Sequence, residues 1–378
     1  MSFEKFDLHA SLLDNLKRLG YQIPTPIQTQ AILEINKGKD LLGIAKTGSG
    51  KTASYVLPIL NALILRTKTV KAREPKVLIL VPTRELAIQV ADVFLELSNN
   101  FRNPIKILSV YGGVSINPQM KALFGVDILV ATPGRLLDLH RSNALVFSKV
   151  EKLVLDEADK MLNLGFEKEM QDIFYLLPKS RQNILFSATL SDQLSGLNKV
   201  LLKDPAVVKI EDKNDEEELI NLMGYFVSDE RKGPLLRHII KEKEMKQVLV
   251  FTSSGAKADR VADKLNKNGI DAMAIHGKKN QSMRTRSLEA FKSGELQVLV
   301  STDLISRGID INELPFVINY ELPRSPKDFV HRVGRTGRAN NEGLAITFVT
   351  RDETHHFKVI LKKMKRYMEM IDAEEMVF

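Results

Sequence analysis

Short apolar runs alternate with helix-like stretches over the first half of the chain. The runs occupy residues 41–45, 77–81, 105–110, 128–131, 153–155 and 184–186. Runs of this length without polar alternation are typical of strands buried on both faces, and intervening segments such as 84–97 carry apolar residues at helical spacing. The pattern predicts an α/β fold with a doubly wound parallel sheet.

A second alternation of the same kind follows in the second half. Its apolar runs lie at 248–251, 272–275, 298–300, 317–318 and 345–349. Between the halves, the acidic run 211–218 has dense like charge and no apolar periodicity, so we expect a solvated, flexible linker there. The sequence therefore predicts two tandem α/β domains, 1–210 and 219–378, joined by that linker.

The composition fits two domains that do not depend on cysteine chemistry. The chain has 378 residues, of which 44% are hydrophobic and 27% charged, enough for two separate cores. With no cysteine, there is no disulfide framework, no thiolate nucleophile and no common zinc module with sulfur ligands. The first residues do not resemble a signal peptide, and no apolar run reaches the length of a membrane span. We expect a cytoplasmic protein.

The net charge of +8 is carried by both predicted domains. Residues 1–210 hold 27 Lys and Arg against 20 Asp and Glu, and residues 219–378 hold 27 against 21. Two basic domains suit a polyanionic partner held by electrostatic attraction, although a basic balance also occurs in proteins that need it only for solubility.

A glycine-rich loop follows the first apolar run and leads into a helical pattern. Gly48 and Gly50 permit backbone angles closed to other residues, so successive N–H groups can face an anion at the positive end of the helix. Lys51 would reach the outer phosphates of a nucleoside triphosphate, and the Thr52 hydroxyl is placed to bind Mg²⁺. A glycine-rich turn that caps a buried helix is the alternative. The loop comprises Ala45, Lys46, Thr47, Gly48, Ser49, Gly50, Lys51 and Thr52.

A stiff turn with two prolines precedes this loop at residues 20–28. It would hold Gln28 at the mouth of the following helix. A glutamine amide donates and accepts together, which matches the edge of adenine and mismatches guanine. The alternative is a rigid turn that starts a helix and leaves the Gln28 side chain in solvent.

Three acids leave one buried strand together, immediately after residues 153–155. They are Asp156, Glu157 and Asp159. Clustered carboxylates repel one another unless a cation lies among them, which suits the Mg²⁺ expected from the loop. Asp156 would hold the metal through water, and Glu157 would orient and deprotonate the water that attacks the γ-phosphate. An acidic helix N-terminus is the alternative.

Arginines are the chemistry that the second domain offers, in the segment 331–338. Arg335 and Arg338 could neutralise charge developing on a transferring phosphate once the two domains have closed. A basic face that binds nucleic-acid phosphates, or only solvent, is the alternative.

Taken together, these segments resemble the DEAD-box RNA helicases of superfamily 2, ATP-dependent enzymes with two RecA-like domains. The likeness runs from about residue 3 to about residue 338, and the chain resembles a minimal core of that family. The matching motifs are the segment 20–28, the phosphate loop, PTRELA at 82–87, the glycine pair 112–113, TPGR at 132–135, DEAD at 156–159, SAT at 187–189, Gln281 with Arg284, STD at 301–303, RGID at 307–310 and HRVGRTGR at 331–338.

The resemblance implies how ATP is bound. Phe3 would stack on adenine, Tyr21 lies in the same adenine-binding segment, Gln28 would read the adenine edge, and Asp310 would meet the ribose. Arg335 and Arg338 look like the fingers that reach the γ-phosphate. Lys46 stands where the family often has glutamine, which leaves the phosphate-binding loop intact.

The resemblance also implies an RNA site and a coupling element. Ser187 and Thr189 would join the acidic cluster to His331. The RNA contacts, mostly to sugar and phosphate, would come from Thr83, Arg84, Gly113, Thr132, Arg135, Gln281, Arg284, Thr302, Arg307 and Gly308. Recognition of the 2′-hydroxyl would favour RNA over DNA.

We therefore predict a monomeric, ATP- and Mg²⁺-dependent RNA helicase that binds RNA with little sequence specificity and opens short duplexes locally. ATP and RNA would close the two domains cooperatively, and hydrolysis would reopen them. Three alternatives remain: a DNA-directed translocase, an ATP-gated RNA clamp with slow turnover that serves as an assembly platform, and a small-molecule kinase. The kinase would leave the second domain without a function.

Overall fold

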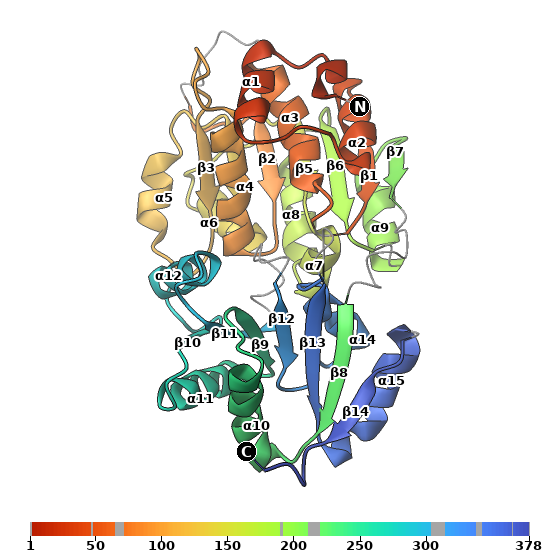
Figure 1. The fold of residues 1–378 in the computed structure, drawn as a ribbon. Helices are drawn as coiled ribbons and strands as arrows, with labels where there is room; N and C mark the ends of the chain where they lie inside the picture. Colours follow the sequence, from red (N-terminus) through yellow and green to blue (C-terminus); the bar gives the residue numbers. More distant parts are fainter. Residues whose placement is uncertain are drawn as a thin grey trace. The chain divides into compact units, whose positions relative to one another are not determined.

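The chain forms two α/β units, Met1–Glu211 and Asp212–Phe378, each built on one parallel sheet with helices on both faces (Figure 1). The structure is a computed structural model that describes residues 2–46, 48–64, 72–189, 192–210, 220–303, 314–337, 342–364 and 366–377. The acidic run 211–218 lies outside these residues. The predicted fold class of two α/β layers with parallel sheets is confirmed.

The first unit contains a seven-stranded sheet in the order β3-β4-β2-β5-β6-β1-β7, with every neighbouring pair parallel. Its strands are β1 (Leu41–Ile44), β2 (Val77–Leu80), β3 (Ile107–Val110), β4 (Ile128–Ala131), β5 (Lys152–Leu155), β6 (Gln182–Ser187) and β7 (Ala206–Lys209). Its helices are η1 (Phe3–Phe6), α1 (Ala10–Arg18), α2 (Pro26–Asn36), α3 (Lys51–Ile64), α4 (Arg84–Leu97), α5 (Ile116–Ala122), α6 (Pro133–Arg141), α7 (Ala158–Asn163), α8 (Glu167–Leu176) and α9 (Asp192–Leu201).

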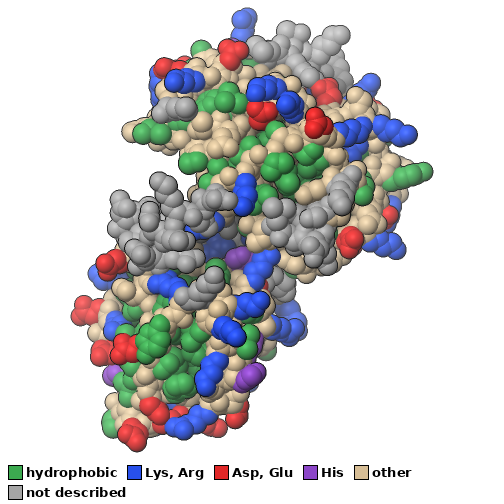
Figure 2. All heavy atoms as spheres, turned by 90° about the vertical axis from the view of Figure 1, so that its right-hand side faces the viewer, with side chains coloured by type: hydrophobic (Ala, Val, Ile, Leu, Met, Phe, Trp, Pro, Cys, Tyr) green, Lys and Arg blue, Asp and Glu red, His purple; other side chains and the backbone are tan. Residues whose placement is uncertain are grey.

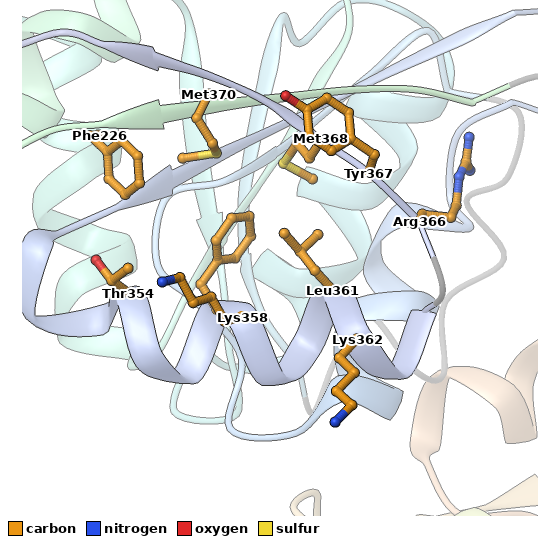
Figure 3. Close-up of a pocket in the computed structure, with 10 residues that line it drawn as sticks. Phe226, Thr354, Lys358, Leu361, Lys362, Arg366, Tyr367, Met368 and Met370 are labelled. Carbon is orange, nitrogen blue, oxygen red and sulfur yellow. The ribbon is translucent and has the colours of Figure 1, made fainter.

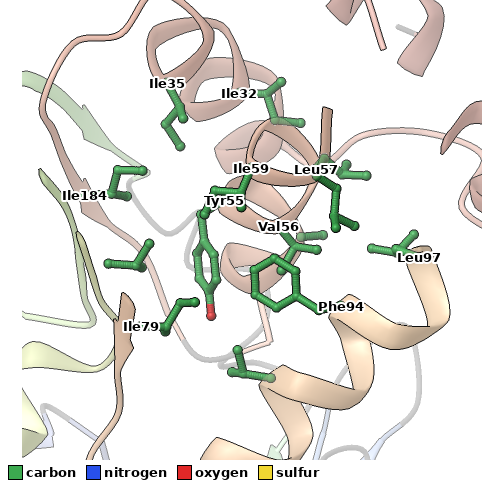
Figure 4. Packing of buried hydrophobic residues seen from close by; sticks show 14 of the residues in the cluster. Ile32, Ile35, Tyr55, Val56, Leu57, Ile59, Ile79, Phe94, Leu97 and Ile184 are labelled. Carbon is green, nitrogen blue, oxygen red and sulfur yellow. The ribbon is translucent and has the colours of Figure 1, made fainter. Parts of the chain in front are cut away.

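The strands of this sheet are buried on both faces, which explains their unbroken apolar runs. In β2, Val77 and Ile79 face a core shared with α1 to α4, whereas Leu78 and Leu80 face a second core shared with α6 to α9. Figure 4 shows part of the first core, where side chains of α2, α3 and α4 pack together against the sheet. Both faces of the strand must be apolar, so no polar alternation remains in the sequence.

The second unit repeats this plan in the order β10-β11-β9-β12-β13-β8-β14. Its strands are β8 (Ile220–Phe226), β9 (Val248–Thr252), β10 (Ala272–Ile275), β11 (Val298–Thr302), β12 (Phe316–Asn319), β13 (Gly343–Val349) and β14 (Glu369–Asp372). Its helices are α10 (Asp229–Glu242), α11 (Gly255–Asn266), α12 (Gln281–Lys292), α14 (Pro326–Val333), η3 (Arg351–Glu353) and α15 (Thr354–Met364). Among the described residues, no helix is both long and apolar enough to cross a membrane.

Arg332 joins three segments inside the second unit. Its guanidinium binds both carboxylate oxygens of Asp303, at 2.5 and 2.8 Å, and donates to the Glu321 carbonyl at 2.6 Å. It also lies 5.0 Å from the centre of the Phe251 ring. Because the side chain is only 2% exposed, this arginine of the segment 331–338 stabilises the fold.

Gly43→Ala should destabilise the first unit, because a Cβ at Gly43 would lie 2.3 Å from the ring of Phe186, which is fully buried and cannot move aside. Overpacking of this kind costs about 1–3 kcal/mol, measurable by urea unfolding. The double variant Gly43→Ala with Phe186→Leu should recover part of that loss. Gly196→Ala in α9, where a Cβ meets nothing within 4 Å, is the control; equal stabilities for the two alanine variants would contradict the packing argument.

Candidate active site

The predicted strand, loop and helix around the phosphate-binding segment are present. Strand β1 ends at Ile44 and α3 begins at Lys51, while Gly48 and Gly50 take φ values of 84° and 92°. The Lys51 ammonium is buried and donates to the Ala45 carbonyl at 2.7 Å, so it spans the loop. Thr47 lies outside the described residues.

Gln28 braces this loop from the start of α2. Its Oε1 accepts from the Thr25 backbone N–H at 2.9 Å, which forms a capping box with Thr25, and its Nε2 donates to the Gly50 carbonyl at 3.3 Å. Thr25 Oγ1 donates to the Ser49 carbonyl at 2.8 Å. Gln28 is 3% exposed, so the side chain is not in solvent as the alternative interpretation required. The turn before α2 therefore has two roles: it starts the helix, and it supports the phosphate loop.

Phe3 and Tyr21 lie together before α2. The two rings meet edge to face at 6.4 Å between centroids, and Phe3 meets Phe6 at 6.0 Å in the same way. Phe3 is 4% exposed, so in this structure it packs within the protein. Stacking of Phe3 on adenine stays a prediction, as does the contact of Asp310 with ribose, since Asp310 lies outside the described residues.

The acidic cluster lies at the carboxyl end of β5. The Tyr55 hydroxyl donates to Asp156 Oδ2 at 2.8 Å, and the Lys160 ammonium binds Glu157 Oε1 at 2.5 Å. Glu157 has a left-handed backbone, with φ 54° and ψ 46°. Its second oxygen, Oε2, is buried and has no hydrogen-bond partner among the described residues. This oxygen is free to accept a proton from a bound water molecule.

Burial sets the protonation behaviour of Glu157. It raises the pKa of the Glu157 carboxyl above its usual value, and the charge of Lys160 opposes that rise. A general base works best when its pKa approaches the working pH, so the direction of the shift suits proton abstraction from water.

The donor chemistry at this point fits Mg²⁺. The described residues contain no group of three or more His, Cys, Asp or Glu side chains arranged to hold a metal. Mg²⁺ does not need one, because it keeps several waters and takes one or two protein oxygens besides the phosphates. Asp156 supplies a buried carboxylate, and Thr52 supplies a hydroxyl at the start of α3.

The segment after β6 is joined to the acidic cluster. Thr189 Oγ1 donates to Asp159 Oδ2 at 3.1 Å, and Ser187 Oγ donates to the Thr189 carbonyl at 2.8 Å. The structure thus brings Thr189 to Asp159, with Ser187 bonded to Thr189. His331 lies on α14 of the second unit, and its coupling to these residues stays a prediction.

The first unit gathers its five predicted RNA residues at one sheet edge. Thr83 and Arg84 follow β2, Gly113 follows β3, and Thr132 and Arg135 follow β4, and these three strands are neighbours in the parallel sheet. A Cβ at Gly113 would lie 2.1 Å from the guanidinium of Arg84, so only glycine allows this contact.

The Arg135 side chain is buried, with only 8% of its surface exposed. Its Nη2 donates to the Val114 carbonyl at 2.8 Å, whereas Nη1 has no hydrogen-bond partner within the described part of the chain. A buried N–H of a charged group that lacks a partner favours an anionic ligand such as a phosphate.

In the second unit, three of the predicted RNA residues lie on one strand and on the helix that precedes it. Thr302 ends β11, and Gln281 and Arg284 lie in the first turn of α12, which follows β10. Arg335 is 5% exposed, and its carbonyl accepts from Leu314 N–H at 3.0 Å. Arg307, Gly308 and Arg338 lie outside the described residues.

A groove of about 500 Å³ lies apart from these residues, between α15 and β14 (Figure 3). Phe226, Leu361 and Met370 give it an apolar lining, with Lys358 and Lys362 beside it. On this side of the second unit, hydrophobic side chains gather at the surface among Lys and Arg (Figure 2). None of the predicted site residues lines the groove.

Sequence reasoning missed two contacts of the acidic cluster, those of Tyr55 and Lys160. A signal for Tyr55 was present, because a tyrosine inside an apolar helix needs a partner for its hydroxyl. Lys160 lies three residues after Glu157, a spacing at which helical side chains can pair.

Two family models match the chain: the DEAD/DEAH box helicase model over residues 25–197, and the helicase conserved C-terminal domain model over residues 231–340. The chain is 37% identical to the ATP-dependent RNA helicase CshA of Listeria monocytogenes, over 98% of this chain and 70% of the relative. It is 36% identical to the ATP-dependent RNA helicase DeaD of Buchnera aphidicola, over 99% of this chain and 60% of the relative.

Solved structures show the same two-unit fold. The chain resembles a DEAD box protein from Methanococcus jannaschii with a TM-score of 0.54 and 36% identity, over 98% of this chain and 99% of that one. It resembles Saccharomyces cerevisiae Dbp5 bound to RNA and ADP BeF3 with a TM-score of 0.85 and 27% identity, over 99% and 96% of the two chains.

Gln28→Ala should relax the preference for ATP over GTP and lower the stability of the first unit by about 1 kcal/mol, the usual loss for a helix cap. Both effects follow because one amide caps α2 and would read the base. Competition binding with the two nucleotides and thermal unfolding measure them. The control, Thr350→Ala, removes the capping box of the second unit and should lower stability alone. If Gln28→Ala were destabilised but kept the full preference for ATP over GTP, the role of Gln28 would be limited to capping α2.

Proposed function

Because the chain belongs to the DEAD-box helicases, we propose that it uses ATP hydrolysis to open short RNA duplexes, holding the RNA by its backbone with little sequence preference. It is an ATP-dependent RNA helicase and therefore an ATPase. The observation that carries the chemistry is the Glu157 carboxylate: Lys160 holds one oxygen, and the other is buried without a hydrogen-bond partner among the described residues.

The phosphate loop would bind the outer phosphates of ATP. Its inward-facing N–H groups and the Lys51 ammonium would neutralise phosphate charge, and Lys51 is already positioned across the loop by the Ala45 carbonyl. Thr52 and Asp156 would hold Mg²⁺, which when bound supplies further neutralisation of the phosphate oxygens. Gln28, fixed by its capping bonds, would present its amide to adenine.

Hydrolysis would then depend on Glu157 and on the second unit. Glu157 Oε2 would accept a proton from the attacking water, since its raised pKa favours proton uptake. Arg335 and Arg338 would stabilise charge on the transferring phosphate, as arginine fingers do. Thr189, bonded to Asp159, and Ser187, bonded to Thr189, would relay closure to the acidic cluster through His331.

RNA would be held by residues of both units. In the first unit, Arg84 and Arg135 would contact phosphates, and Gly113 allows the strand to approach closely. In the second unit, the contacts would come from Gln281, Arg284 and Thr302, and from Arg307 and Gly308, which lie outside the described residues. Contacts to sugar and phosphate position RNA without reading its sequence, so we propose general RNA binding by a monomer in the cytoplasm.

RNA should stimulate steady-state ATP hydrolysis, and DNA of the same sequence should not, because the 2′-hydroxyl distinguishes the two. The measurement is phosphate release at saturating ATP with matched single strands, followed by displacement of a labelled strand from a short RNA duplex. Equal stimulation by DNA would indicate a DNA-directed translocase. ATP-dependent RNA retention with no more than one turnover would indicate a clamp.

Glu157→Gln should lower the turnover number by about 10²–10⁴-fold, the usual contribution of a general base, and should preserve ATP-dependent RNA binding. Phosphate release and fluorescence anisotropy of labelled RNA measure the two properties. Glu167→Gln, the same change at an exposed position of α8, is the control and should behave as the wild type. Undiminished turnover in Glu157→Gln would remove Glu157 from this role.

A further inference from the structure

Tyr55 is an unexpected polar group in the apolar core of the first unit. It lies on α3 and is fully buried among Ile59, Phe94 and Phe186 (Figure 4). A phenylalanine would fill this space equally well, but a buried hydroxyl needs a partner. The partner is Asp156, whose Oδ2 accepts the hydroxyl hydrogen at 2.8 Å.

The neighbouring rings fix the position of that hydroxyl. The Tyr55 ring lies 5.7 Å from Phe186 and 6.4 Å from Phe94, measured between centroids. A ring packed on two sides in a dense core has little freedom to turn, so its oxygen is a fixed hydrogen-bond donor. The Thr52 side chain, one turn earlier on α3, also interacts with this hydroxyl.

We propose that Tyr55 is a positioning residue for the metal, whose hydroxyl orients the Asp156 carboxylate to bind the Mg²⁺ that accompanies ATP. The inference rests on the proposed function, and it adds a residue that touches neither nucleotide nor metal. Carboxylates that bind metals need hydrogen bonds that hold them in place, and loss of such a bond typically weakens metal binding by about 10–100-fold. Tyr55 uses one acceptor site of the Asp156 carboxylate, and the remaining sites would be open to the metal and its water.

One further observation fits this role. The Tyr55 hydroxyl links the two predicted metal ligands, because Thr52 and Asp156 come from different elements and both interact with it.

The test is Tyr55→Phe, which removes one oxygen and keeps the ring. Mn²⁺ serves as a paramagnetic probe, and its affinity for the complex of the full chain with ADP is measured by electron paramagnetic resonance. We expect affinity to fall about 10–100-fold, while ADP binding in EDTA, measured by calorimetry, is unchanged. Tyr225→Phe is the matched control, because Tyr225 is also a buried tyrosine and its hydroxyl donates to Met223 Sδ of the second unit, at 3.2 Å.

Asp156→Asn completes a double-mutant cycle. If Tyr55 acts through Asp156, adding Tyr55→Phe to Asp156→Asn should weaken Mn²⁺ binding no further. An unchanged Mn²⁺ affinity in Tyr55→Phe would overturn the proposal. The proposal would also fail if the losses of Mn²⁺ affinity from Tyr55→Phe and from Asp156→Asn added in the double variant. Either result, obtained with a wild type that shows RNA-stimulated ATP hydrolysis, leaves the proposed function in place. A wild type without such hydrolysis would instead overturn the proposed function.

Discussion

The two adjacent buried carboxylates of Asp156 and Glu157 are the main electrostatic constraint on the first unit. Asp156 is 2% exposed and Glu157 is 6% exposed. Like charges that are this close and this far from water destabilise the folded state unless nearby groups compensate them. The structure compensates them unequally. Asp156 accepts a hydrogen bond from the neutral Tyr55 hydroxyl, whereas Glu157 Oε1 is paired with the Lys160 ammonium. The second oxygen of Glu157 has no hydrogen-bond partner within the described part of the chain, which is why we propose it as the proton acceptor.

The sheet makes this arrangement possible because all its strands end at the same edge. Strand β5 lies between β2 and β6, so the acids that follow it meet the segments after both neighbours. Thr189 reaches Asp159 from β6, and the Asp156 backbone N–H donates to the Leu80 carbonyl of β2 at 3.0 Å. The residues proposed for the nucleotide and those proposed for RNA after β2, β3 and β4 thus lie at the same edge of one sheet.

The sequence was most informative where one local rule decided the structure. The unbroken apolar runs predicted strands buried on both faces, and β2 shows why, with alternate residues in two different cores. The fold class followed from these runs, whereas the family and the RNA helicase activity were predicted from a resemblance of motifs, and all three are confirmed. Strands β8 and β14 were missed because their residues are only partly buried and β8 contains Gly224, so neither forms an apolar run. Contacts between distant segments, such as Arg332 with Asp303, have no periodic signature at all.

Gln28 shows why a functional motif and a structural motif can be the same residues. The pair Thr25 and Gln28 has the spacing of a capping box, and the structure forms both of its bonds. The same glutamine donates to the Gly50 carbonyl. A side chain at position 50 would disturb this bond, because its Cβ would lie 2.5 Å from Gln28 Nε2. A residue that reads a base must be rigid, and the cap supplies that rigidity. The bond to Gly50 ties the same amide to the phosphate loop, so any shift of the loop on binding phosphate moves the group proposed to recognise adenine.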